Sequence, residues 1–283
     1  MELHAVDSLD AALDVLATRG ERCQVLAGGT DVMVQLARGE ITPAALLHVE
    51  RIEALRGIEV DGPITLGALV THRELAKGVL GDGFRSVAES AATVGGRQTQ
   101  VVGTIGGNVC NASPAADTVP ALLVHDATVT LRSSAGSRTV PLSAFLVGRR
   151  ATTRAPDELL TAIGMPATGE GSGDVYLKVG RRSAMEVAIV GLAMRLRFDE
   201  AGTVTEARVA LASVGPRPQR ATGAEAALVG GPLEPDRVDA AASAVLDGVE
   251  PVDDLRATAA YRRRVVPGLL RRAAGICAQR AGR

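Results

Sequence analysis

The sequence is poor in aromatic residues and has no excess of either charge. It contains no tryptophan, and aromatic residues make up 2% of its 283 residues, so the core must be built from valine, leucine, isoleucine and alanine. Nucleic-acid-binding proteins commonly stack bases on aromatic side chains and surround phosphates with a basic field. With 31 Lys and Arg against 32 Asp and Glu, the chain offers neither feature. We therefore expect no nucleic-acid partner.

Cysteines and long apolar runs are also scarce. The three cysteines, Cys23, Cys110 and Cys277, lie far apart, and this spacing fits neither a disulfide framework nor the ligands of zinc or an iron–sulfur cluster. No apolar run approaches the ~20 residues that span a bilayer, and the first residues lack the basic and apolar segments of a signal peptide. We expect a cytoplasmic protein with no membrane span and no metal site of its own.

What is present is typical of a globular protein with two domains. Apolar residues make up 46% and charged residues 22% of the chain, and its length exceeds the ~100–200 residues of one domain. The glycine-rich segment 168–173 is the best linker candidate, because small flexible residues need no packing. We therefore expect one domain over residues 1–170 and a second over residues 174–283.

Hydrophobic periodicity and turn residues predict an α+β fold. Helices are expected at 9–20 (capped by Ser8 or Asp7), 31–38, 71–77, 85–93, 117–124, 221–229, 235–248 and 254–280. Strands are expected at 23–26, 45–50, 64–69, 127–132, 138–141, 158–165, 175–179, 187–198 and 204–212. Residues 95–111 hold five glycines and are expected to form a loop. Strands followed by helices, rather than regular alternation, argue against a doubly wound parallel sheet.

The first candidate site is a glycine-bearing turn between a strand and a helix. It comprises Val25, Leu26, Ala27, Gly28, Gly29, Thr30 and Asp31. A Gly-Gly pair at a helix start lets the backbone turn tightly and directs free N–H groups and the positive helix end toward one point, which suits a pyrophosphate. The run lacks the spacing of a Rossmann fingerprint or a P-loop. For this loop alone, a purely structural turn is the commoner explanation.

A second glycine-bearing run strengthens the ligand hypothesis. It comprises Gly103, Thr104, Ile105, Gly106, Gly107 and Asn108, where hydroxyl and amide side chains flank the glycines and can bond phosphate oxygens. Asp117, further along, could accept hydrogen bonds from ligand hydroxyls or cap its own helix. Because a dinucleotide has two phosphates and a long polar tether, two such loops together favour nucleotide binding over coincidence.

Other polar residues give weaker signals. Lys178 lies on a predicted strand, where a cation could stabilise the negative charge of a reduced cofactor or simply reach solvent from an edge. The four histidines, His4, His48, His72 and His125, show no metal-ligand spacing and are expected to be surface or turn residues. No Gly-x-Ser-x-Gly run marks a hydrolase nucleophile. The arginines of residues 262–264 are expected on a solvated helix face.

These residues together resemble the FAD-binding, medium subunit of the xanthine dehydrogenase and carbon monoxide dehydrogenase family of molybdenum hydroxylases. The resemblance lies in residues 26–32, 104–111, 113–117 and 157–160, and in Lys178 with the following Arg-Arg pair. It implies a two-lobe FAD-binding domain of the vanillyl-alcohol-oxidase (PCMH) type, then a small C-terminal domain with an antiparallel sheet and helices. It also implies that both loops hold the FAD pyrophosphate, and that Asp117, Leu159 and Lys178 contact the ribityl chain or flavin ring.

The same resemblance implies partners. The molybdenum cofactor would lie on a large subunit and the 2Fe-2S clusters on a small subunit, in a dimer of heterotrimers. Electrons would pass through FAD to NAD or another acceptor. Thr30-Asp31 resembles the xanthine dehydrogenase branch, and Glu186 replaces the more usual aspartate of the family. Two alternatives remain open: a self-contained flavin oxidase of related fold, and a non-catalytic scaffold in which both glycine turns are structural.

Overall fold

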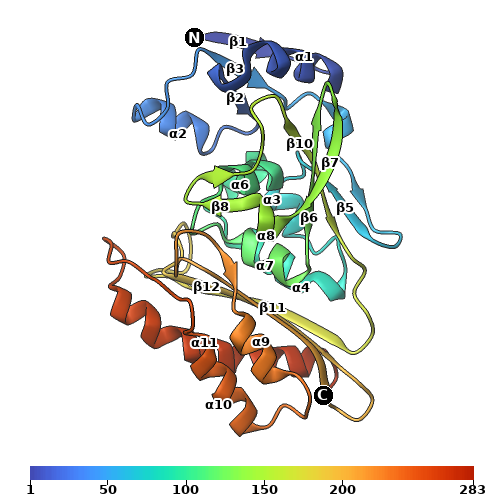
Figure 1. Cartoon of the computed structure of the whole chain (residues 1–283), viewed down its shortest axis with the longest axis vertical. Coiled ribbons are helices and arrows are strands. Elements are labelled where there is room, and N and C mark those ends of the chain that lie inside the picture. The colour runs from blue at the N-terminus through green and yellow to red at the C-terminus, as the bar shows by residue number, and fades with distance from the viewer.

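The computed structural model describes residues 1–283 and has the predicted α+β class (Figure 1). From the N-terminus to the C-terminus the chain forms an N-terminal lobe, a middle lobe and a C-terminal region, each built around its own sheet. None of its helices combines the length and the apolar character that crossing a membrane requires.

The N-terminal lobe is a small parallel sheet with two helices. Its strands β1 (Glu2–Ala5), β2 (Cys23–Leu26) and β3 (Ala45–His48) pair in the order β1-β3-β2, with α1 (Leu9–Arg19), η1 (Gly20–Arg22) and α2 (Val32–Ala37) as connections. The Ser8 hydroxyl accepts the Ala11 N–H at 3.3 Å, as the cap prediction required. Leu13 and Leu16 of α1 are buried against this sheet, so the predicted apolar stripe does form the contact.

The middle lobe contains a five-stranded antiparallel sheet and most of the short helices. Strands β4 (Ile58–Glu59), β5 (Ile64–Gly67), β10 (Leu159–Met165), β6 (Thr128–Ser133) and β7 (Gly136–Pro141) pair in that order. The other elements are η2 (Glu53–Leu55), α3 (His72–Leu75), η3 (Asp82–Phe84), α4 (Arg85–Ala92), α5 (Arg97–Val102), α6 (Ile105–Asn111), α7 (Thr118–Val124), α8 (Leu142–Phe145), β8 (Leu146–Gly148) and β9 (Ala151–Thr152). The largest buried apolar cluster of the chain lies here.

The prediction of a loop over residues 95–111 is wrong, because the segment forms helices α5 and α6. Glycine density concealed them, but Gly103 only separates the two helices. The Thr104 hydroxyl accepts the Gly107 N–H at 3.1 Å and so caps α6. Ile105 and Val109, both fully buried, bind α6 to the core. A cap and two buried side chains therefore outweigh the low helix propensity of glycine here.

The C-terminal region is an antiparallel sheet buried on both faces. Strands β11 (Ser172–Val179), β12 (Val190–Phe198), β13 (Val204–Ala212) and β14 (Gln219–Arg220) pair in sequence order. Helices α9 (Thr222–Leu228), α10 (Pro235–Ala244) and α11 (Ala259–Arg280) cover one face, and the middle lobe covers the other (Figure 1). Along β12, Leu192 and Met194 pack against the helices, whereas Ala193 packs against the middle lobe. The helix side of the strand is therefore apolar, whereas the middle-lobe side also carries Arg195, which lies 3.8 Å from Asp126.

Several boundaries in this region differ from the sequence prediction, and α10 ends at Ala244 rather than residue 248. Strand β12 begins at Val190 rather than residue 187, and α11 begins at Ala259, where the Thr258 hydroxyl accepts the Tyr261 N–H. The last two residues of the predicted linker, 172 and 173, belong to β11. The prediction that Arg262 is solvated is also wrong, because its guanidinium is buried and donates to the Ile189 carbonyl at 2.6 Å.

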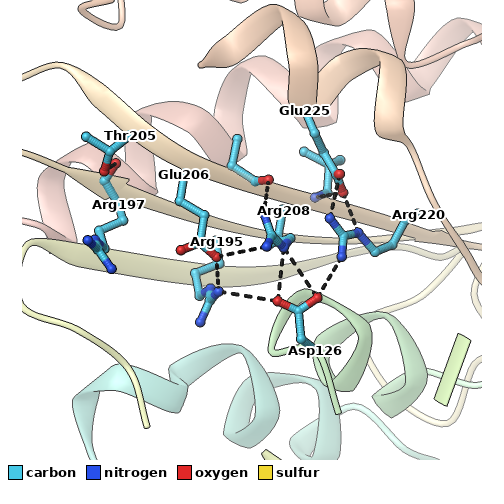
Figure 2. Close-up of polar contacts among 10 residues, drawn as sticks. Asp126, Arg195, Arg197, Thr205, Glu206, Arg208, Arg220 and Glu225 are labelled. Carbon is cyan, nitrogen blue, oxygen red and sulfur yellow. Dashed lines mark hydrogen bonds and ion pairs between the residues drawn. The ribbon is translucent and has the colours of Figure 1, made fainter. Parts of the chain in front are cut away.

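A network of charges joins the middle lobe to the C-terminal sheet, and we call this boundary the seam. Figure 2 shows Asp126, which follows α7, pointing at arginines from the facing strands. Its carboxylate lies 2.7 Å from Arg220 and 3.0 Å from Arg208, and Arg195 lies 3.8 Å away. Arg220 also pairs with Glu225 at 2.6 Å. The acidic groups therefore offset the arginines within the seam itself.

A second, fully buried polar group lies in the same seam. His125 lies in the turn after α7, as one of the two predicted alternatives required, but it is 0% exposed, so the surface alternative is wrong. Its Nε2 lies 3.1 Å from Ser86 Oγ and 3.1 Å from Asp174 Oδ2, and the Ser86 N–H donates to the same carboxylate oxygen. Serine and aspartate both meet one ring nitrogen, which is not the relay of a catalytic triad. The group connects α4, α7 and β11.

Candidate functional site

A cavity of about 730 Å³ lies between the N-terminal and middle lobes and is lined by both predicted loops. Its size falls within the range of small-molecule sites. The predicted site residues that line it are Val25, Ala27, Gly28, Gly29, Thr30, Asp31, Gly103, Thr104, Gly106, Gly107, Asn108, Asp117 and Leu159. Leu26, Ile105 and Lys178 do not line it. Ile105 is instead a core residue of α6.

The two loops touch each other. A Cβ atom added at Gly28 would lie 1.7 Å from the Val102 carbonyl oxygen and 3.2 Å from the Gly103 nitrogen. Only glycine permits so close a backbone approach. The glycine-bearing turns, 75 residues apart when counted from Gly28 to Gly103, therefore meet in one wall of the cavity.

The first loop carries free hydrogen-bond donors. The N–H groups of residues 28 to 31 donate no hydrogen bond to any backbone or side-chain acceptor of the chain. Gly29 has a φ of +70°, which turns the backbone into α2. Successive unpartnered amides at a helix start are a suitable site for an anion. The sequence prediction of converging donors therefore fits this loop.

The second loop differs, because most of its N–H groups are already used. Ile105 and Gly106 donate to the carbonyls of Val70 and Ala68, and Gly107 donates to Thr104 Oγ1. Within residues 103–108 only the Thr104 N–H has no partner. This loop therefore offers a free amide, a hydroxyl hydrogen and the Asn108 amide group rather than a row of N–H donors.

Asp117 does not cap its helix but joins a buried hydrogen-bond network. Its Oδ1 accepts the Tyr176 hydroxyl at 2.6 Å, and its Oδ2 accepts Lys178 Nζ at 2.8 Å. Lys178 also donates to the Thr93 carbonyl at 3.0 Å, and its side chain is 11% exposed, so the solvated-lysine alternative is wrong. Burial raises the pKa of Asp117, and the adjacent Lys178 opposes that rise. Lys178 thus influences the cavity through Asp117.

Arg154 and His72 are among the polar residues of the cavity wall that sequence reasoning missed. Arg154 lines the cavity, donates to the carbonyls of Ala155 and Glu158, and has no carboxylate within 4.0 Å. His72 lines the cavity and is 2% exposed, so the surface or turn prediction is wrong for it. His72 lies within the Thr71–Glu74 capping box and Arg154 precedes the 157–160 run by three residues, but neither position indicates a ligand contact by itself.

Glu186 also lines the cavity, at the segment between β11 and β12. Its carboxylate lies 3.5 Å from both Arg181 and Arg182. No group of three or more His, Cys, Asp or Glu side chains is placed to hold a metal ion. The donors that this cavity presents, free amides and an arginine without a carboxylate, suit an anionic organic ligand such as a nucleotide diphosphate.

Comparison with known proteins gives concordant matches along the chain. Residues 1–168 match the model of the FAD binding domain in molybdopterin dehydrogenase, and residues 175–275 match that of the CO dehydrogenase flavoprotein C-terminal domain. The chain is 31% identical over 277 residues to the 6-hydroxypseudooxynicotine dehydrogenase complex subunit alpha of Paenarthrobacter nicotinovorans, covering 97% of this chain and 93% of that protein. It is 29% identical over 283 residues to the xanthine dehydrogenase FAD-binding subunit of Escherichia coli O157:H7, covering 99% and 96%.

A solved structure agrees with these sequence matches. A chain of the carbon monoxide dehydrogenase from Hydrogenophaga pseudoflava, in a form that lacks the Mo-pyranopterin moiety of the molybdenum cofactor, superimposes with a TM-score of 0.95 at 31% identity. The match covers 99% of this chain and 98% of that chain. Likeness over the whole length therefore extends from sequence to fold.

Proposed function

The chain belongs to the FAD-binding medium subunits of molybdenum hydroxylases, and we propose that its cavity binds FAD to carry electrons through the complex. Electrons would arrive from 2Fe-2S clusters on a partner subunit and leave to NAD or another acceptor. Substrate oxidation would take place at a molybdenum cofactor on another chain. The single observation that carries the proposal is the row of unpartnered amides in residues 28–31, facing a cavity that the second loop completes.

The residues fit FAD in defined roles. The turn of Val25 to Asp31 would bind the diphosphate through its free N–H groups. The loop of Gly103 to Asn108 would add the Thr104 amide and the Asn108 side chain. Asp117 and Leu159 line the cavity and would contact the ribityl chain or flavin ring. Lys178 would influence the cofactor through its hydrogen bond to Asp117.

Bound FAD would supply the redox chemistry, and the chain would position it. Tyr176 and Lys178 occupy one oxygen each of the Asp117 carboxylate and fix its orientation. The touching loops at Gly28 and Val102 close one wall of the cavity. No residue of this chain needs to act on the substrate of the complex.

The family membership supports a wider arrangement. We propose residues 1–170 as the FAD-binding domain and residues 174–283 as the C-terminal domain. The partners would be a molybdenum-cofactor large subunit and a 2Fe-2S small subunit, in a cytoplasmic dimer of heterotrimers. The names of the relatives differ in substrate, so the substrate of this complex would be set by the large subunit.

The test is a titration of the purified chain with FAD, in which quenching of the flavin fluorescence measures binding. The proposal requires saturable, equimolar binding and reduction of the flavin only when the partner subunits and their substrate are added. Turnover of a substrate by the isolated chain would favour the flavin oxidase alternative. A folded chain that takes up no FAD would favour the scaffold alternative.

A further inference from the structure

His72 occupies an unusual position in the wall of the cavity. It follows Thr71, which caps α3 in a capping box with Glu74, so the backbone at this corner is fixed. The His72 N–H donates to the Gly103 carbonyl at 3.0 Å. A Cβ atom at Gly103 would lie 3.1 Å from His72 Cδ2 and 3.6 Å from its Nε2. The imidazole is therefore pressed against the backbone of the second loop.

The imidazole has no hydrogen-bond partner within the chain. Nδ1 is fully buried without one, and Nε2 makes no hydrogen bond either. Burial lowers the pKa of His72 to about 4, so the ring is neutral at pH 7. A neutral imidazole has one N–H donor and one acceptor nitrogen. Nε2 is not among the fully buried atoms of the chain, so it is the ring nitrogen that is open to the cavity and free to bond a ligand there.

The position of the ring indicates which ligand atoms it would meet. Gly103 adjoins Gly28, where the first loop begins its row of free amides. The ring therefore stands beside the meeting point of the two loops and belongs to the same cavity wall. With Nδ1 enclosed by protein, Nε2 is the nitrogen left for a ligand.

We infer that His72 is a cofactor-binding residue whose Nε2–H donates a hydrogen bond to a phosphate oxygen of FAD. The inference rests on the proposed function, because it names a contact for the cofactor proposed there. The neutral ring would supply direction without adding a further positive charge to a wall that already holds Arg150 and Arg154. FAD binding would then not depend on protonation of this histidine between pH 6 and 8.

The test compares two substitutions by FAD titration of the purified chain. His72→Leu removes both nitrogens and should weaken FAD binding about tenfold, whereas His72→Gln keeps an N–H donor and should stay within about threefold of wild type. His48→Leu, at a histidine that does not line the cavity, is the control and should bind FAD as wild type does. Melting temperatures of the FAD-free proteins report any purely structural effect separately.

A second measurement uses the wild-type chain and so does not depend on how the variants fold. With ¹⁵N-labelled histidine, the four histidines give separate ring signals, and His72→Gln identifies the signal of residue 72. Adding FAD should shift its Nε2 resonance and leave that of His125 unchanged. If wild type binds FAD but His72→Leu binds equally well, or the resonance does not move, the inference is overturned alone. If wild type binds no FAD, the proposed function fails first.

Discussion

Two buried histidines show how the cavity and the seam differ. His125 in the seam meets Ser86 and Asp174 through Nε2, so the chain itself supplies its partners. His72 in the cavity wall has no partner at either nitrogen, and the N–H groups of residues 28–31 nearby have none. An unpartnered atom does not by itself indicate a ligand site, because Nδ1 of His125 is also unpartnered. The difference is that His72 lines the cavity and His125 does not.

The charged groups repeat the same contrast. Asp126 in the seam is surrounded by arginines that carry their own acidic partners (Figure 2). Arg154 in the cavity has only carbonyl acceptors. Polar groups satisfied inside the chain stabilise the fold, whereas groups left open toward a cavity are available to a ligand. Substitutions in the seam should therefore change stability, and substitutions in the cavity should change FAD affinity.

The largest effect is expected at Gly28, where both stability and FAD affinity should fall strongly. Gly28→Ala places a methyl group 1.7 Å from the Val102 carbonyl oxygen, so the loops must separate. We expect a loss of about 3 kcal/mol in unfolding free energy and about 100-fold in FAD affinity. Urea unfolding and FAD titration measure the two. Gly57→Ala is the control, since nothing lies within 4 Å of its added Cβ atom. Near wild-type affinity in Gly28→Ala would show that the contact of the loops does not shape the site.

The next effect should separate the two regions. Asp174→Asn removes the carboxylate charge that accepts the Ser86 N–H and faces His125, in a fully buried position. We expect unfolding free energy to fall by about 2 kcal/mol, because hydrogen bonds to a buried charged group contribute about 1.5–3 kcal/mol. FAD affinity should change less than about twofold, because Asp174 does not line the cavity. Asp82→Asn, in an exposed pair with Arg85, should change neither. A large loss of FAD affinity in Asp174→Asn would mean that the seam shapes the cavity.

A pH experiment tests whether His72 is buried and neutral in the cavity wall. Its folded-state pKa of about 4 lies below the ordinary value of 6.5, so the unfolded chain binds the proton more tightly. Keeping His72 neutral therefore costs no unfolding free energy above pH 6.5, whereas stability falls as pH decreases from 6.5 toward 4. Between pH 6.5 and pH 4 the unfolding free energy of wild type should fall by about 2 kcal/mol more than that of His72→Gln. Thermal unfolding of both FAD-free proteins across this range is the measurement. Equal slopes would mean that His72 is not neutral in the folded chain.

Much of the fold follows from sequence because its long elements have strong local patterns. Strands β12 and β13 and helix α11 lie close to their predicted ranges, since their apolar runs and turn residues are continuous. Helices α5 and α6 were missed because both are short, glycines flank α5, and Gly106 and Gly107 lie within α6. Their stability comes from a cap at Thr104 and from buried Ile105 and Val109, and burial depends on elements distant in sequence.

The site divides in the same way. Most residues of the two glycine-bearing runs line the cavity because each run is one continuous motif, although the second forms the start of α6 rather than a loop. Lys178 was correctly placed on a strand, yet its contact with Asp117 joins residues 61 positions apart. His72, His125 and Arg262 look like ordinary surface residues in sequence, and only tertiary packing buries them. The role of isolated polar residues can therefore be assigned only from the structure, whereas glycine-bearing motifs can be recognised in the sequence.

The smallest effect is expected at Tyr176, which belongs to both regions. Its backbone N–H donates to Glu89 beside the seam, and its hydroxyl donates to Asp117 in the cavity. Tyr176→Phe removes only the hydroxyl, so Asp117 Oδ1 loses its donor while Lys178 remains on the other oxygen. We expect about a threefold loss of FAD affinity and about 1 kcal/mol of stability, the ordinary contribution of one hydrogen bond.

The pH dependence of FAD binding shows which contact is responsible. The Tyr176 hydroxyl helps to lower the pKa of Asp117, so its removal should raise that pKa further. The pH below which FAD binding weakens should then move to a higher value. Tyr261→Phe is the matched control, since this second tyrosine of the chain lies beneath Arg264 on α11 and does not line the cavity. An unchanged acid limit in Tyr176→Phe would restrict this residue to the seam, and the two regions would then be independent at the one side chain that touches both.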